Sequence, residues 1–304
     1  MTEEGRIAMT RWENAMTVLS TMSIQLPITQ YSLLSIPEPH VLLITFNRPK
    51  QLNALSVEAN WEIHRVIEWA EAQDTIWCII VTGQGQQAFC TGMDLISAQR
   101  SSNSAGGNLL TSVNLPPTGF AGISNRSIQA RKPIIAAVNG YALGGGTEII
   151  LACDIVVATK RSTFGLPEVK RGVVIAAGGL ARLARSVSYQ LASELALTGR
   201  FFSADEAKAY GLVNEVIPSE DNVVEAALVW ARKIIANSPD AVFLTKQGLS
   251  FALERDSMTG ATAEWLQSDE AKAWSKGENL AEGLLAFASK RKPQWKNPSS
   301  ASKL

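Results

Sequence analysis

A run of three glycines between two apolar segments constrains this chain more than any other feature. A β-type run at residues 132–138 precedes Gly144-Gly145-Gly146, and an apolar run at 149–153 that can start a helix follows. The glycines therefore mark a strand-to-helix turn, where a backbone N–H can approach a ligand because no side chain intervenes. The unpaired N–H groups and the positive dipole end of the helix favour a developing negative charge. Glu148 adds a carboxylate to this candidate active site.

Glu168 is a second acid in glycine-rich, apolar surroundings. It ends the segment Phe164-Gly165-Leu166-Pro167-Glu168, in which the proline fixes the backbone just before the acid. Two carboxyl groups that converge in a dry pocket have raised, coupled pKa values, so one can deliver a proton while the other removes one. The residues leave an alternative open, in which Glu168 caps a turn or pairs with Lys170 or Arg171. The glycine run likewise has structural and phosphate-binding alternatives, although it does not fit the dinucleotide pattern.

Apolar, strand-like runs alternate with helical patterns through the first two-thirds of the chain. Near-continuous apolar strands are typical of sheets buried between layers, so the pattern predicts the α/β class. From about residue 200 the patterns are helical, and a capping box at Ser203 and Glu206 begins that part. The expected strands are 41–46, 76–81, 132–138 and 154–158, and the later helical patterns are 221–236, 240–254, 258–275 and 279–290.

These patterns predict four parts. We expect a flexible extension at residues 1–27, a core with the site at 28–200, a helical region for oligomerisation at 201–295 and a tail at 296–304. A segment rich in Ser, Asn, Gly and Pro at 98–117 predicts a mobile loop that could cover a pocket.

The composition excludes several classes of function. Basic and acidic residues balance at 28 each among 304, so no overall field recruits nucleic acid or an anionic membrane, and no apolar run is long enough to span one. Two histidines, His40 and His64, are too few and too far apart for a metal site, and we predict none. The three cysteines lie among apolar or small residues and are expected to be buried and inert: Cys78, Cys90 and Cys153.

The sequence ends in Ser302-Lys303-Leu304. At a carboxyl terminus this tripeptide is an address read by the peroxisomal import receptor, so we predict a peroxisomal location. The alternative is a chance ending on a frayed tail. The N-terminal residues carry no apolar signal core and mix arginines with acids, which is a poor secretory or mitochondrial signal.

Several ordered motifs together resemble the crotonase superfamily and, within it, the enoyl-CoA hydratases. The resemblance runs from about Val41 to about Trp295. It implies a spiral of ββα units with a helical C-terminal region, a homotrimer or a dimer of trimers, and an acyl-CoA thioester as ligand. The residues that carry it lie at 47–50, 53–55, 88–95, 139–148, 164–168, 197–200, 207–213 and 287–292.

The resemblance also implies roles for individual residues. The backbone N–H groups of Met93 and Gly145 would form an oxyanion hole. Glu148 would take a proton from water as it attacks C3 of a trans-2-enoyl-CoA, and Glu168 would deliver a proton to C2, without a metal or other cofactor. Further substrate contacts are implied for Asp94, Leu95, Gly144, Phe287 and Lys290, the last two across a subunit boundary. A merely solvated basic last helix is the alternative for Phe287 and Lys290.

One stretch departs from the family pattern. Many hydratases have a Pro-Gly pair before Ala-Gly-Gly, whereas this chain reads Ile175-Ala176-Ala177-Gly178-Gly179. The acyl pocket is therefore expected to differ. The alternatives to a hydratase are an isomerase or hydrolase acting on acyl-CoA, and a binding protein for RNA or a scaffold. Balanced charge and the absence of a basic-aromatic stripe disfavour RNA, and the two glutamates disfavour a scaffold.

Overall fold

The computed structural model describes residues 24–298 apart from 96, 98–113, 128–129 and 220. Most of the expected loop at 98–117, most of the expected extension at 1–27 and the last six residues lie outside the described residues. Within the described part, no helix is both long enough and apolar enough to cross a membrane.

Two sheets form the centre of the molecule. The larger has the order β1-β2-β3-β5-β7-β10 and is parallel except for the antiparallel β1–β2 pair. The smaller has the order β4-β6-β8-β9. Their strands are β1 (Ser32–Glu38), β2 (Val41–Phe46), β3 (Cys78–Gly83), β4 (Ala88–Cys90), β5 (Ile134–Val138), β6 (Tyr141–Leu143), β7 (Ile155–Thr159), β8 (Thr163–Gly165), β9 (Phe201–Ser203) and β10 (Glu215–Ile217).

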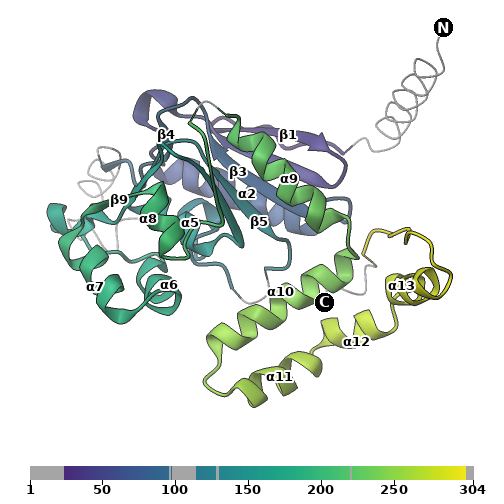
Figure 1. Ribbon diagram of the computed structural model, residues 1–304. Coiled ribbons are helices and arrows are strands. Elements are labelled where there is room, and N and C mark those ends of the chain that lie inside the picture. Colours follow the sequence, from purple (N-terminus) through teal and green to yellow (C-terminus); the bar gives the residue numbers. More distant parts are fainter. Residues whose placement is uncertain (1–23, 96, 98–113, 128–129, 220, 299–304) are drawn as a thin grey trace, which may run out of the picture.

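Alternate residues of the large sheet enter two different cores, because successive side chains of a strand point to opposite faces. Ile79 and Ile134 lie in the larger core, together with the buried face of α2. Ile80 and Ile135 pack against α9, which crosses the other face of the sheet (Figure 1). Burial on both faces explains why these strands are almost continuously apolar.

The helices divide into two groups. One group packs around the sheets, and the other, α10 to α13, lies below them in the view of Figure 1. The capping box that starts α8 is confirmed, with Ser203 and Glu206 in reciprocal hydrogen bonds. The helices are α2 (Val57–Ala72), α5 (Gly145–Ala152), α6 (Gly179–Ser186), α7 (Tyr189–Thr198), α8 (Ala204–Ala209), α9 (Val223–Ile235), α10 (Pro239–Glu254), α11 (Met258–Leu266), α12 (Asp269–Ser275) and α13 (Glu278–Ala288), with short 3₁₀ turns η1 (Pro49–Gln51), η2 (Phe120–Gly122) and η3 (Pro167–Arg171).

The α/β prediction is confirmed, with two corrections of detail. Two strands follow residue 200: β9 belongs to the smaller sheet and β10 to the larger one. The sheet core therefore extends into the part expected to be helical. The helix expected over 258–275 is two helices, because Ser268 accepts a hydrogen bond from the Ala271 N–H and starts α12 as a new helix.

Candidate active site

The glycine run lies where strand β6 ends and helix α5 begins. Gly144 adopts a left-handed φ of 55°, and its N–H donates to the Gly165 carbonyl at 2.9 Å. The hydroxyl of Thr147, in the first turn of α5, lies 2.8 Å from the same carbonyl. The end of β8 is thereby tied to the start of α5, and the short connection from Gly165 brings Glu168 to this turn.

Glu148 is almost fully buried in the first turn of α5. Its Oε1 accepts two hydrogen bonds, from the Ala177 N–H at 2.9 Å and from the Gly179 N–H at 3.0 Å. Burial raises the pKa of Glu148, and the two N–H donors oppose that rise by favouring the ionised form. Both donors lie on Oε1, which leaves Oε2 as the oxygen that can accept a proton from water.

Glu168 lies in the first turn of the short helix η3, and its carboxyl group turns back toward the glycine run. A Cβ placed on Gly144 would lie 3.1 Å from Glu168 Oε1, so the carboxyl group rests against this glycine. Its Oε2 is buried and has no hydrogen-bond partner among the residues that the structure describes. Burial and, to a lesser degree, the charge of Glu148 raise the pKa of Glu168 to about 7.

The two acids therefore differ in a way that suits opposite proton transfers. Glu148 is held by main-chain donors that favour its anion, whereas Glu168 has an oxygen with no partner and a pKa near neutrality. The sequence alternative of an ion pair with Lys170 or Arg171 does not occur, since no ion pair involves Glu168 in the described part of the chain.

Met93 and Gly145 come together at the same turn. A Cβ on Gly92 would lie only 2.7 Å from the Gly145 nitrogen, so the backbone before Met93 touches the start of α5. Gly92 has a φ of 85°, which places the 92–93 peptide beside this nitrogen at no steric cost. Within residues 24–298 as described, neither the Met93 N–H nor the Gly145 N–H donates a hydrogen bond to the protein. Two neighbouring amide donors are thus free for a ligand oxygen.

The other predicted contacts are distributed unevenly. Asp94 lies next to Met93 and pairs with Arg48 at 2.9 Å, and Leu95 is half-exposed beside it. Phe287 is 88% exposed on α13, and this helix lies on the other side of the view from α5 and α6 (Figure 1). Lys290 follows α13. One subunit therefore does not bring Phe287 and Lys290 to the two glutamates.

Sequence reasoning missed the two amides that bind Glu148 and the side chains behind them. The glycine pair Gly178-Gly179 was the sequence signal for this close approach. Only glycine fits at 179, because a Cβ there would lie 2.5 Å from Glu148 Cγ and 3.0 Å from Ile175 Cγ2. The same crowding places the Ile175 side chain beside Glu148. Phe120 was also missed, although its ring covers Gly145 so closely that a Cβ there would lie 2.7 Å from the ring.

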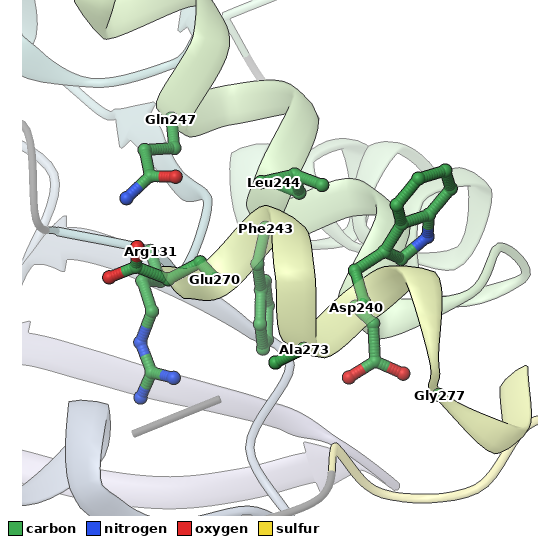
Figure 2. A pocket seen from close by; sticks show the side chains of 9 residues that line it. Arg131, Asp240, Phe243, Leu244, Gln247, Glu270, Ala273 and Gly277 are labelled. Carbon is green, nitrogen blue, oxygen red and sulfur yellow. The ribbon is translucent and has the colours of Figure 1, made fainter. Parts of the chain in front are cut away.

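Two cavities elsewhere do not include these residues. A cavity of about 30 Å³ between α10 and α12 is lined by Arg131, Phe243 and Gln247 among others, and it has room for only one or two water molecules (Figure 2). A larger polar groove of about 730 Å³ lies at the carboxyl ends of the large sheet, beside Asn139 and Arg161. Among the described residues no cluster of metal-ligating side chains is present.

Comparison with known proteins decides the family. The sequence model of the enoyl-CoA hydratase/isomerase family matches residues 38–298. The chain belongs to this family. Among solved structures, an enoyl-CoA hydratase from Bacillus anthracis superposes with a TM-score of 0.78 at 34% identity, covering 88% of this chain and 100% of that one. The predictions of a crotonase-like fold and of an enoyl-CoA hydratase, a hydro-lyase, are confirmed.

Curated relatives of this hydratase/isomerase family differ in the substrate that their names give. The mevalonyl-coenzyme A hydratase of Aspergillus fumigatus is 43% identical over 89% of this chain and 96% of its own length. The mevalonyl-coenzyme A hydratase of Beauveria bassiana is 40% identical over 91% of this chain and 99% of its own length. A short-chain-enoyl-CoA hydratase of Clostridium acetobutylicum is 37% identical over 84% of this chain and 94% of its own length.

Proposed function

We propose that this hydratase adds water to a 2-enoyl-CoA, and removes it in reverse, with Glu148 and Glu168 as the proton-transferring pair. In the hydration direction the Glu148 carboxylate takes a proton from water while the water oxygen bonds to C3. The C2–C3 π electrons move toward the thioester carbonyl, and Glu168 supplies the proton that C2 gains. The Met93 and Gly145 N–H groups stabilise the negative charge on the thioester oxygen.

One observation supports this proposal more than any other. The buried Glu168 oxygen has no partner and belongs to a group whose pKa is about 7, beside a carboxylate held by two amides. A carboxyl group kept partly protonated at neutral pH is suited to protonating carbon. A pair that shares one proton can run the reaction in either direction, because the proton ends on the other acid after each turnover.

The test is a pair of isosteric variants. Glu148→Gln and Glu168→Gln should each lower kcat for hydration of crotonyl-CoA by about 10²–10⁴-fold, because each removes one proton transfer. Glu225→Gln, which changes an exposed carboxylate on α9, is the matched control and should leave kcat unchanged. If either active-site variant retains the activity of the control, that acid is not part of the reaction. A shift of a 3-enoyl-CoA double bond without any hydration would instead favour an isomerase.

For the natural substrate we propose the mevalonyl thioester named by the two relatives, dehydrated at C2–C3. Its C3 carries both a hydroxyl and a methyl group, so loss of water gives a methyl-branched 2-enoyl thioester with a terminal hydroxyl. Ile175 supports a changed acyl pocket, because its side chain is nearly buried beside Glu148 and many hydratases have Pro-Gly at the positions of Ile175 and Ala176. In a substrate panel, kcat/KM for mevalonyl-CoA dehydration and crotonyl-CoA formation from 3-hydroxybutyryl-CoA can be compared directly. The branched substrate should be preferred by about tenfold or more, and a preference for the straight chain would overturn this assignment.

We also propose that the subunits assemble through the helical region at 201–295. Exposed apolar side chains on these helices support assembly, since such surfaces are typical of interfaces. Contact with a neighbouring copy would also give Phe287 and Lys290 access to a coenzyme. Sedimentation velocity should show a trimer or hexamer, and a monomer would refute the idea. The exposed residues include Leu249, Leu253, Leu266, Leu284 and Phe287.

The peroxisomal location remains a proposal that rests on Ser302-Lys303-Leu304, outside the described residues. A fluorescent protein fused to the N-terminus should accumulate in peroxisomes, whereas the same fusion without Leu304 should remain outside them. Equal distribution of the two fusions would refute the targeting role of this tripeptide.

A further inference from the structure

A buried serine stands directly behind the amides that hold Glu148. Ser124 is fully buried, and its hydroxyl donates to the Ala177 carbonyl at 2.7 Å. Ala177 and Gly179 supply the two N–H donors to Glu148, so the carbonyl that Ser124 binds lies between these donors along the chain. The hydroxyl therefore fixes the peptide group that joins one donor to the other.

The main-chain carbonyl of Ser124 also contacts the segment that carries the two amide donors. A Cβ on Gly178 would lie 2.7 Å from the Ser124 carbonyl oxygen, so this glycine packs directly on the serine. Gly178 has a φ of 100°, which turns the chain between the two donors. The Ser124 carbonyl also accepts from Arg182 Nε at 3.0 Å, and Arg182 lies one turn into α6. Hydroxyl, carbonyl and close packing all fix the start of α6 against residue 124.

The serine also reaches toward the oxyanion site. Its Oγ accepts from the Phe120 N–H at 2.9 Å and closes the short turn η2. The Phe120 ring covers Gly145, whose N–H is one of the two proposed oxyanion donors. The Ala121 N–H donates to the buried Asn60 at 2.9 Å, which anchors the turn to α2. One hydroxyl thus contacts the supports of both the base and the oxyanion site.

We propose that Ser124 is a positioning residue, which aligns the Ala177 and Gly179 amides on Glu148 and couples this alignment to the Gly145 amide through Phe120. The inference rests on the proposed role of Glu148 and adds a residue that does not touch the substrate. Two amides that are held rigidly favour the anion of Glu148 and fix the direction of its free oxygen. Looser amides hold that anion less well and orient it less well.

The charged groups on the neighbouring elements do not provide this function. Glu168, on η3, is the acid that faces Glu148. Arg182, on α6, donates to the carbonyls of Ser124 and Arg126. The Arg126 guanidinium approaches Asp154 at 3.5 Å, at the far end of α5. None of these cations pairs with Glu148 among the described residues, so the anion is stabilised chiefly by the amides that Ser124 fixes.

The test uses a graded series at residue 124 in the full-length enzyme. Ser124→Ala removes the hydroxyl, and Ser124→Cys keeps a similar shape with a weaker donor. For hydration of crotonyl-CoA we expect kcat to fall about tenfold in the alanine variant and less in the cysteine variant, with KM within about twofold of the parent value. The acidic limb of the kcat/KM profile should move to higher pH by about 0.5–1 unit in the alanine variant, because the anion of Glu148 loses stabilisation.

Ser162→Ala is the matched control. Ser162 is also buried, and its hydroxyl donates to the Val138 carbonyl at 2.9 Å, away from the two glutamates. A purely structural loss would lower the thermal stability of both alanine variants without moving the acidic limb. An unmoved limb in Ser124→Ala would therefore overturn the inference. If that variant fails to fold, an unmoved limb in Ser124→Cys overturns it equally.

The Glu148→Gln variant separates this inference from the proposed function. Full activity of Glu148→Gln would refute the role of Glu148, and the Ser124 inference would fall with it. An inactive Glu148→Gln enzyme together with an unmoved limb in both Ser124 variants would refute only the role of Ser124. An inactive Glu148→Gln enzyme and a graded upward shift would support both.

Discussion

Substitution of Gly92 by alanine tests the oxyanion geometry without changing any acid. A methyl group at residue 92 would lie 2.7 Å from the Gly145 nitrogen and 3.0 Å from the Leu143 carbonyl oxygen. Ordinary contacts of this kind begin near 3.4 Å, so the two amide donors must move apart by about 0.7 Å. Displacements of this size remove much of the benefit of aligned donors. We expect kcat for crotonyl-CoA hydration to fall by about 10²-fold, close to the loss of one oxyanion donor.

The control for this experiment is Gly211→Ala. Gly211 also has a left-handed φ, 78° against 85° for Gly92, but a Cβ there would meet nothing within 4 Å. Both variants should therefore lose about 1–2 kcal/mol of unfolding free energy from backbone strain, and Gly92→Ala should lose somewhat more from crowding. Absorbance of the conjugated thioester follows hydration, and urea titration follows stability. If kcat of Gly92→Ala stays within about twofold of Gly211→Ala, the proposed alignment of the Met93 and Gly145 amides is wrong.

Two further predictions concern pH and the buried ion pair. The two carboxyl groups should be active when they share one proton. The value of kcat/KM should therefore fall as the pH rises through about 7, where Glu168 ionises, in both reaction directions. A flat profile from pH 6 to 9 would contradict this. Lys246→Ala should lower the free energy of unfolding in urea by about 3 kcal/mol, because the buried Lys246 amine donates to Asp154 and to the Lys132 carbonyl, each at 2.7 Å. Removal of the exposed amine in Lys272→Ala should change it by less than about 0.5 kcal/mol, and equal losses would refute the importance of burial.

Strands β2, β3, β5 and β7 of the large sheet could be predicted because each is an almost continuously buried, apolar run. Strand β1 was not predicted, because its exposed and buried residues alternate. Residues 41–46 were expected as a strand and form β2, and 132–138 contains β5. Strands β6, β9 and β10 could not be predicted, since three residues are too few to show a period and their pairing depends on distant partners. The main helices of the C-terminal region could be predicted from their apolar periodicity. The break between α11 and α12 could not, because it depends on the Ser268 cap, which periodicity does not reveal.

Side chains of the candidate site were easier to foresee than the groups that hold them. Glu148 and Glu168 stand out because acids in apolar, glycine-rich segments are unusual. The amides of Ala177 and Gly179 have no side-chain signature, because every residue except proline carries an N–H, and the adjacent Gly178-Gly179 pair is the sequence signal that marks them. Ser124 is less visible still: a serine in a loop gives no sign that its hydroxyl binds a carbonyl 53 residues further along the chain.

The groups that bind Glu148 are main-chain N–H groups, so they do not depend on which side chains stand beside them. Side chains at 175 to 177 can be exchanged while the amide at 177 keeps its direction, provided that the glycines at 178 and 179 remain. The stretch proposed to line the acyl pocket can therefore vary while the proposed acid–base step of Glu148 is preserved. A gene duplicate could acquire a new acyl preference through a few substitutions here, without passing through an inactive intermediate.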